Sequence, residues 1–401
     1  MTSELSNPEP GPPAGPLAGV RVLELAGIGP GPFAAMLLAD LGADVVRVDR
    51  PGGQGLGIDP ALDVTNRNKR SVLVDLKAPE GVGALLELAT RADILIEGWR
   101  PGTAERLGVG PRPCLERNPR LVYGRMTGWG QDGPLARTAG HDIAYIAVTG
   151  ALALAGPDGS APTAPANLLG DYAGGALYLV AGVLAALHHA RAHGAGQVVD
   201  AAIVDGTAHL TAFLHGMRAA GAWQDRRGAN LLDGGAPFYG VYATKDGRHM
   251  AVGALEERFY GEFCERLGLG PQEAALRADR AAWPRLRERI ADLFRTRTRE
   301  EWTEVFRDGD ACVAPVLDLS EAPAHPHLAA RGTLTAYAGA VQPAPAPRFS
   351  ATPATLRRPP AQPGAHTAEV ARDWDAPALA AVPTDGTDRP PRPSTSPKGP
   401  T

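Results

Sequence analysis

The 401-residue sequence contains few cysteines and no large excess of either charge. Its three cysteines, Cys114, Cys264 and Cys312, lie far apart. An odd number without close spacing argues against a disulfide framework, a redox pair or a cysteine metal site, and it favours a reducing compartment, so we expect a cytoplasmic protein. Forty basic against 44 acidic residues leave no global positive field for nucleic acid or an anionic membrane. Local charge must therefore meet any anionic ligand.

Long apolar runs and targeting signals are also scarce. The longest apolar run, residues 173–187, is shorter than the ~20 residues that cross a bilayer, which favours a buried core helix. The first fifteen residues lack the basic start and apolar stretch of a signal peptide, and the final "KGPT" is no peroxisomal signal. We therefore expect neither a membrane nor a nucleic acid as a partner.

The chain divides by composition. Residues 1–15 and 376–401 are rich in proline and serine, which predicts disordered tails. From residue 16 to 201, short β-branched runs alternate with helical patterns, which predicts an α/β large domain with a mostly parallel sheet. Residues 240–316 indicate a small α+β domain, with linkers at 202–239 and 317–338. The predicted strands of the large domain are 20–25, 45–49, 71–76, 94–97 and 121–126.

The loop "AGIGPGPFAA" follows the first predicted strand and allows two interpretations. Gly29-x-Gly31-x-x-Ala34 matches the dinucleotide fingerprint, so an NAD-dependent oxidoreductase is one hypothesis. Against it, Pro30 and Pro32 have no N–H to offer a pyrophosphate. The alternative is a turn that packs a helix against the sheet.

Basic side chains follow successive predicted strands. Arg50, Lys77 and Arg100 each come after one, and Arg106 lies a little further on. The carboxyl edge of a parallel sheet is where such folds bind ligands. Four cations at this edge suit a ligand with several phosphates, and coenzyme A, with a diphosphate and a 3′-phosphate, fits better than NAD.

Long segments of the chain resemble the family III CoA-transferase superfamily and, within it, the α-methylacyl-CoA racemases. The resemblance runs from about Pro16 to Trp374 and includes "GVRVLELAGIGPGPFAAMLLADLGADVVRVDRP", "ADILIEGWRPGTAERLG", "RMTGWGQDGPLARTAGHDIAYI" and "NLLGDYAGGALYLVAGVLAAL". It implies a Rossmann-like large domain that residues 339–375 complete. It also implies an interlocked homodimer in which each small domain closes the partner's active site.

Inversion at a carbon next to a thioester requires two groups on opposite faces, one to remove the proton and one to return it. A histidine with a pKa near ~6.5 can serve as one group, and a carboxylate can serve as the other. Asp171 precedes an apolar run, where helix capping alone would explain it. The resemblance assigns His141 and Asp171 as the acid/base pair, His141 for the (S)- and Asp171 for the (R)-substrate. It also implies that Glu256, otherwise a surface glutamate, orients His141 from the partner chain.

The resemblance also implies the substrate contacts, with no cofactor beyond the coenzyme A moiety. Residues 140–145 would line the pantetheine and thioester, Gly140, Asp142 and Tyr145 among them, with Ala144 where the family usually has asparagine. No spaced ligand set predicts a metal site, and His188, His189 and His193 are expected to face solvent. The nucleotide and phosphates would contact Arg50, Val74, Asp75, Leu76, Lys77, Gly98, Trp99, Arg100 and Arg106.

The sequence thus predicts a racemase or epimerase of 2-methylacyl-CoA thioesters that works through an enolate. The alternative is a CoA transferase, in which Asp171 is a nucleophile that forms acyl-anhydride and CoA-thioester intermediates. That chemistry needs no histidine, so His141 favours the racemase. A non-catalytic CoA-binding protein remains the residual hypothesis, and the identity of the acyl chain is left open.

Overall fold

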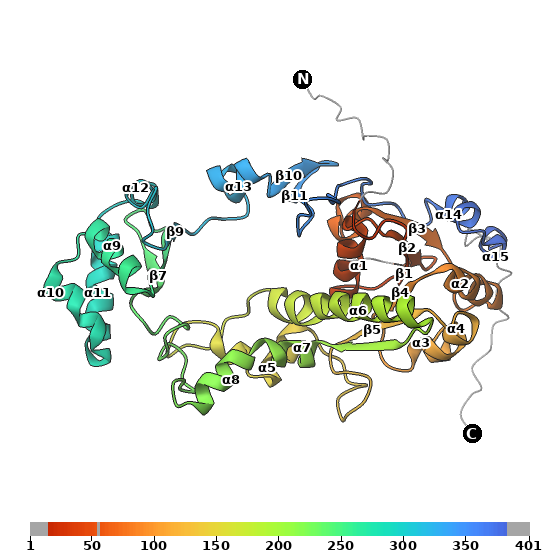
Figure 1. The fold of residues 1–401 in the computed structure, drawn as a ribbon, viewed down its shortest axis with the longest axis horizontal. Coiled ribbons are helices and arrows are strands. Elements are labelled where there is room, and N and C mark those ends of the chain that lie inside the picture. The colour runs from red at the N-terminus through yellow and green to blue at the C-terminus, as the bar shows by residue number, and fades with distance from the viewer. Residues whose placement is uncertain (1–14, 54–56, 383–401) are drawn as a thin grey trace, which may run out of the picture. The chain divides into compact units, whose positions relative to one another are not determined.

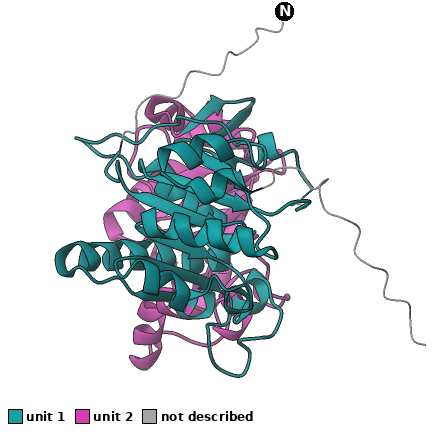
Figure 2. Ribbon diagram, turned by 90° about the vertical axis from the view of Figure 1, so that its right-hand side faces the viewer, with its two compact units in different colours: residues 1–145, 168–207, 334–401 teal, residues 146–167, 208–333 magenta. Residues whose placement is uncertain are grey.

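The computed structural model describes residues 15–53 and 57–382 of the chain (Figure 1). They form two compact units (Figure 2). Of the described residues, unit 1 comprises 15–53, 57–145, 168–207 and 334–382, and unit 2 comprises 146–167 and 208–333. Most residues of the two expected tails lie outside the described part of the chain.

Unit 1 is built on a six-stranded parallel sheet in the order β3-β2-β1-β4-β5-β6. This is the strand order of a doubly wound sheet, and the expected α/β class with a mostly parallel sheet is confirmed. The order reverses between β1 and β4, so a crevice is expected at their carboxyl ends. The strands are β1 (Arg21–Leu25), β2 (Asp44–Asp49), β3 (Lys69–Leu73), β4 (Ile94–Glu97), β5 (Val122–Thr127) and β6 (Val198–Ala202).

Helices cover both faces of this sheet. Side chains alternate along each strand, so Val22 of β1 packs with α1 and α6 while Leu23 packs with the opposite layer. One layer contains α1 (Pro30–Asp40) and α6 (Leu177–His193). The other contains α2 (Pro79–Arg91), α4 (Pro111–Arg117), α14 (Thr367–Asp373) and α15 (Pro377–Ala380). The unit also includes α3 (Thr103–Arg106), β10 (Leu334–Tyr337), β11 (Ala340–Pro343) and residues 203–207 of α7 (Ile203–Leu210).

The C-terminal segment corrects one expectation. Residues 376–382, predicted as part of a disordered tail, instead include α15 and bury Leu379 completely in the core that α2 and α14 share. The composition of the whole tail, rich in proline and serine, did not indicate an ordered segment. Burial of Leu379 and Val382 stabilises this one.

The helix that contains the apolar run is longer than the run itself. A π-helical segment, η4 (Leu168–Ala176), continues into α6, and the 26-residue stretch Leu168–His193 is long and apolar enough to cross a membrane. Length and composition alone are weak evidence, because core helices pass the same test; 39% of its most apolar window is buried, and Leu179 and Val183 pack against the sheet. The expectation that this apolar stretch is too short to span a bilayer is therefore wrong.

Unit 2 contains a three-stranded antiparallel sheet of β7 (Tyr239–Ala243), β8 (His249–Gly253) and β9 (Val313–Pro315). Aromatic side chains dominate its core, where Phe294 packs against Phe263 and Trp302. Its helices are α8 (Ala212–Ala219), α9 (Glu257–Leu267), α10 (Pro271–Ala274), α11 (Trp283–Phe294), α12 (Arg299–Val305) and α13 (Pro326–Arg331), and α5 (Asp142–Val148) joins the two units.

Both expected linkers contain regular structure. Residues 202–239 include α7 and α8, and residues 317–338 include α13 and β10. Pro323 and Pro326 do not keep this linker extended: they lie in the first turns of short helical segments, where a backbone N–H is not needed. The 3₁₀ segments of the described residues are Pro60–Leu62, Val64–Asn66, Leu152–Leu154, Ala275–Ala278, Arg280–Ala282 and Ala322–Ala324.

Candidate active site

The loops after β1 and β4 meet at the point where the strand order reverses. The indole Nε1 of Trp99 donates a hydrogen bond of 3.3 Å to the carbonyl of Ala26, and the backbone N–H of Trp99 donates one of 2.8 Å to Glu97. Glu97 is buried, and burial raises its pKa, while Arg125 at 2.9 Å opposes the shift. A buried charged pair therefore holds the loop that carries Gly98, Trp99 and Arg100.

Asp171 lies within the π-helical segment η4 and not at a helix N-cap, so the capping interpretation is wrong. Glycines allow the unusual close packing there: a Cβ on Gly174 would lie 2.3 Å from the Thr207 hydroxyl, and one on Gly175 3.0 Å from Ile203. π-Helical turns occur often at functional sites. This geometry places Asp171 inside the helical segment, facing neighbours from two other elements.

The first of these neighbours is the turn before α1. Gly29 has φ 72° and ψ −122°, a conformation that favours glycine, and a Cβ at this position would lie 3.1 Å from Oδ2 of Asp171. Phe33, in the first turn of α1, stacks on Tyr172 with ring centroids 4.4 Å apart. The glycine-rich loop therefore packs the start of α1 against η4, in addition to the packing of α1 on the sheet that the turn interpretation predicted.

The second neighbour is the segment that contains His141. His141 is exposed and directly precedes α5, where its carbonyl accepts hydrogen bonds from the N–H groups of Ala144 and Tyr145. Asp142 is only 6% exposed, and its Oδ2 accepts a hydrogen bond of 2.7 Å from the backbone N–H of Asp171. His141 and Asp171, the two candidate bases, are thus connected through Asp142, which follows His141 in the chain and bonds the backbone of Asp171.

Tyr145 lies near the same candidate residues. Its ring packs edge-on against Trp129 at 4.8 Å, and a Cβ on Gly128 would lie 2.0 Å from the ring. Burial raises the pKa of Tyr145; the negative charge of Asp171 adds to this, and the positive charge of Arg100 opposes it. Asp171 and Arg100 therefore both lie near enough to act on the hydroxyl of Tyr145. Gly140 also packs against the Tyr145 ring.

The predicted phosphate-binding residues follow the carboxyl ends of three strands of the same sheet, β2, β3 and β4, with β1 between β2 and β4. Arg50 directly follows β2 and is exposed, as are Arg100 and Arg106. Lys77 is exposed but lies four residues beyond β3, because that strand ends at Leu73 and not at Leu76 as predicted. Between them, Val74 is buried, Asp75 and Leu76 are partly buried, and Asp75 accepts the backbone N–H of Lys77 at 2.9 Å.

Glu256 belongs to unit 2. It is exposed, precedes α9 as its N-cap residue, and makes no side-chain capping hydrogen bond. Its expected contact with His141 of a partner chain stays a prediction.

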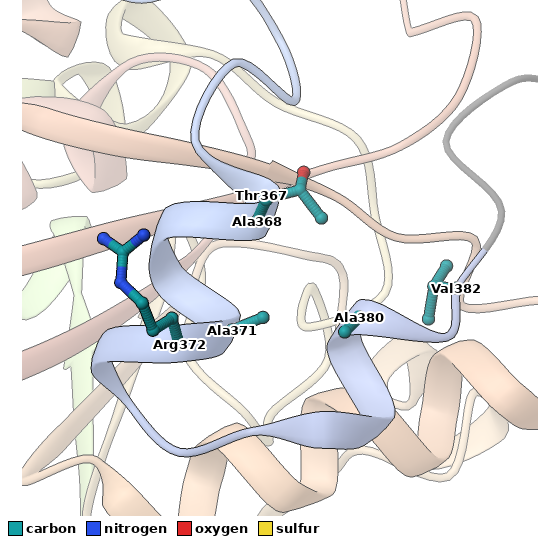
Figure 3. A pocket seen from close by; sticks show the side chains of 6 residues that line it. All are labelled: Thr367, Ala368, Ala371, Arg372, Ala380 and Val382. Carbon is teal, nitrogen blue, oxygen red and sulfur yellow. The ribbon is translucent and has the colours of Figure 1, made fainter.

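Other candidate features lie apart from this arrangement. His188, His189 and His193 are exposed, as expected, and residues 15–53 and 57–382 contain no cluster of side chains suited to a metal ion. A cavity of about 340 Å³ lies between α14 and α15 and contains none of the predicted site residues (Figure 3). It is lined by Thr367, Ala368, Ala371, Arg372, Ala380 and Val382.

Comparison with known proteins gives consistent matches along almost the entire chain. Residues 17–367 match CoA-transferase family III. The chain is 44% identical over 361 residues to α-methylacyl-CoA racemase of Mus musculus, covering 89% of this chain and 93% of that protein, and 44% identical over 363 residues to the enzyme of Homo sapiens, with the same coverage. The crystal structure of a CAIB/BAIF family protein from Brucella suis superimposes with a TM-score of 0.77 at 26% identity, covering 90% of this chain and 100% of that one.

Proposed function

The chain belongs to CoA-transferase family III, and from this premise we propose that it is an isomerase that interconverts (R)- and (S)-2-methylacyl-CoA thioesters. The observation that carries the proposal is the 44% identity, over 89% of the chain, to two α-methylacyl-CoA racemases. The hydrogen bond from the Asp171 backbone N–H to Asp142 supports it, because this bond joins the Asp171 segment to the residue that follows His141. A racemase needs two bases around one carbon.

In the proposed reaction, the imidazole of His141 removes the α-proton of the (S)-thioester. The bonding electrons move into the thioester carbonyl to give an enolate, and the carboxylic acid of Asp171 delivers a proton to the opposite face. In the other direction, the Asp171 carboxylate removes the proton of the (R)-thioester and the imidazolium of His141 returns one. No group besides these two side chains is needed to balance the protons.

Substrate binding would rest on the carboxyl edge of the sheet. Arg50, Lys77, Arg100 and Arg106 offer four exposed cations for the phosphates of coenzyme A, and the strand-end loops offer backbone N–H groups. Gly140, Asp142 and Tyr145 would surround the pantetheine end. We propose no cofactor beyond the coenzyme A moiety itself.

We also propose a homodimer in which Glu256 of one chain hydrogen-bonds His141 of the other. A carboxylate on the imidazole fixes its tautomer and stabilises its protonated form. All three cysteines are free, with Cys114 and Cys264 buried, which supports the proposed reducing, cytosolic compartment.

The second candidate, CoA transfer between carboxylic acids, follows from the family itself, because Asp171 could act there as a nucleophile. The two reactions differ in what happens to the α-proton. A racemase incubated in D₂O with one enantiomer of a 2-methylacyl-CoA places deuterium at the α-carbon and inverts it, which chiral separation and mass spectrometry detect. A hydroxylamine-trapped adduct on Asp171, acceptor-dependent turnover and no α-deuterium would establish the transferase instead.

A further inference from the structure

An ion pair lies in the interior of unit 1 between the sheet and α1. Lys69, the first residue of β3, places Nζ 2.7 Å from Oε2 of Glu24 on β1, and both side chains are 1% exposed. Burial lowers the pKa of Lys69 and raises that of Glu24, and each partner opposes the shift of the other. Two charges so deep in a core need further hydrogen bonds to be retained.

The ammonium group makes these further contacts with the start of α1. Lys69 Nζ donates a hydrogen bond of 2.9 Å to the carbonyl of Pro32 and a weaker one of 3.3 Å to Asn66. Pro32 lies in the first turn of α1. The ion pair therefore fastens that turn to two strands of the sheet beneath it.

The same turn contacts the Asp171 segment. Gly29, directly before α1, is close enough to Oδ2 of Asp171 that a Cβ would approach it to 3.1 Å. Phe33 follows Pro32 and stacks on Tyr172, the neighbour of Asp171. The first turn of α1 thus lies between the buried ammonium group and the candidate base.

We propose that Lys69, held by Glu24, is a positioning residue that fixes the first turn of α1 against Asp171 and so sets the place of its carboxylate. This inference rests on the proposed racemase function. Lys69 acts on Asp171 through the first turn of α1: its Nζ bonds the carbonyl of Pro32, and Gly29, directly before this helix, packs against the Asp171 carboxylate. Displacement of a reacting group by about 1 Å can lower a rate by ~10²-fold, so a small shift of this turn is sufficient.

The opposite end of α1 provides a matched control. Asp40, the last residue of the helix, forms an ion pair of 2.5 Å with Arg67, and both side chains are buried. This second pair fastens the same helix to the chain that precedes β3, but it does so at the end away from Asp171. Its loss perturbs the same fold without acting on the first turn.

The test is α-proton exchange in D₂O by Lys69→Met and by Glu24→Leu/Lys69→Met, which removes both charges and leaves no buried carboxylate unpaired. We expect inversion to fall between ~10- and ~100-fold in both directions, because Asp171 takes part in each. For the (S)-thioester, exchange with retention, which His141 performs alone, should rise relative to inversion. For the (R)-thioester, exchange should fall together with inversion.

The ratio of exchange to inversion does not depend on how much of the protein is folded, so a general loss of stability leaves it unchanged. The control variant Asp40→Leu/Arg67→Met is therefore expected to keep the wild-type ratio. An unchanged ratio of exchange to inversion for the (S)-thioester in both Lys69 variants overturns this inference. Absence of exchange in the wild-type protein instead overturns the proposed function, so the two failures are distinguishable.

Discussion

The carboxylate of Asp142 accepts a hydrogen bond from the backbone N–H of Asp171 at 2.7 Å. Asp142 directly follows His141, so the segment that carries one candidate base anchors the main chain of the other. The second oxygen of this buried carboxylate, Oδ1, has no hydrogen-bond partner among the described residues. The relative positions of the two bases therefore depend on a side chain that was predicted only to line the substrate.

Asp142→Ala is expected to reduce inversion by ~10- to ~100-fold, because Asp171 then loses its anchor and a misplaced base is slow. The free energy of unfolding should fall by about 1.5–3 kcal/mol, the range for a hydrogen bond to a charged group. Asp142→Asn keeps an acceptor oxygen and should recover most of both losses. Rates of inversion and urea unfolding curves measure the two effects. Equal damage from Ala and Asn would contradict an anchoring role.

His141→Ala and Asp171→Asn should each nearly abolish inversion, because each acid–base step contributes roughly 10²–10⁴-fold. They should differ in exchange. Asp171→Asn retains the histidine and is expected to exchange the α-proton of the (S)-thioester with D₂O without inverting it, and His141→Ala should do the same for the (R)-thioester. Mass spectrometry after chiral separation measures both. If His141→Ala instead retains acceptor-dependent CoA transfer, the racemase mechanism fails.

Arg50→Ala and Arg100→Ala should each raise the KM for CoA thioesters by about 10- to 100-fold, since each removes a charge-assisted contact to phosphate. The loss should shrink as salt is raised, because exposed charges are screened. Arg112→Ala is the control: this arginine is 89% exposed on α4, pairs with Glu116, and is not among the residues predicted to bind the nucleotide. Binding of CoA and 3′-dephospho-CoA esters with wild-type affinity by both variants would rule out this nucleotide site.

The stability of unit 1 should depend on the protonation of His366. Its Nδ1 accepts a hydrogen bond of 3.2 Å from the backbone N–H of Ser71, so the neutral ring is required. Burial lowers the pKa of His366; Arg358, Arg70 and Arg47 also lower it, and Glu369 opposes them.

The unfolded chain therefore binds this proton at a higher pH than the folded protein. The stabilisation is complete above the unfolded pKa near ~6.5 and is lost as the pH falls through the lower folded pKa. His366→Asn offers Oδ1 as an acceptor that does not titrate, so its unfolding free energy should fall less between about pH 7 and pH 5 than that of the wild type. Urea unfolding across this range measures the difference, and parallel curves would contradict the assignment.

The sequence predicted the elements that local patterns determine. The strand expected at 94–97 is Ile94–Glu97 in the structure, because a short apolar run between turn signals is typical of a strand covered on both faces. The environment of Asp171 was not predictable in this way. Its π-helical geometry depends on the packing of Gly174 and Gly175 against Thr207 and Ile203, residues about thirty positions away whose contacts carry no local signal.

The burial of the charged pair Lys69 and Glu24 could not be predicted from the sequence either. In "NKRSVLVDLK", Lys69 resembles a solvent-exposed lysine, and only the strand order brings it to Glu24, 45 residues earlier in the chain. The glycine-rich loop matches a dinucleotide fingerprint in the sequence, but in the structure its Gly29 packs against Asp171. Contacts between residues that are distant in the sequence could therefore be established only from the structure.

The last prediction concerns the proposed contact between Glu256 and His141 across a dimer. His141→Ala and Glu256→Ala chains, each expected to be impaired alone, are denatured, mixed in equal amounts and refolded together. Random pairing gives mixed dimers in about half of the molecules, and each then has one site with both side chains intact, so about a quarter of wild-type activity should return.

This fraction distinguishes a contact between subunits from one within a chain. If Glu256 acted on His141 of its own chain, every chain in the mixture would lack one of the two, and pairing would restore nothing. The same two proteins refolded separately and then mixed provide the control, since stable dimers do not exchange chains. Native mass spectrometry confirms that mixed dimers form. Their presence without recovered inversion would show that Glu256 does not complete the partner's site.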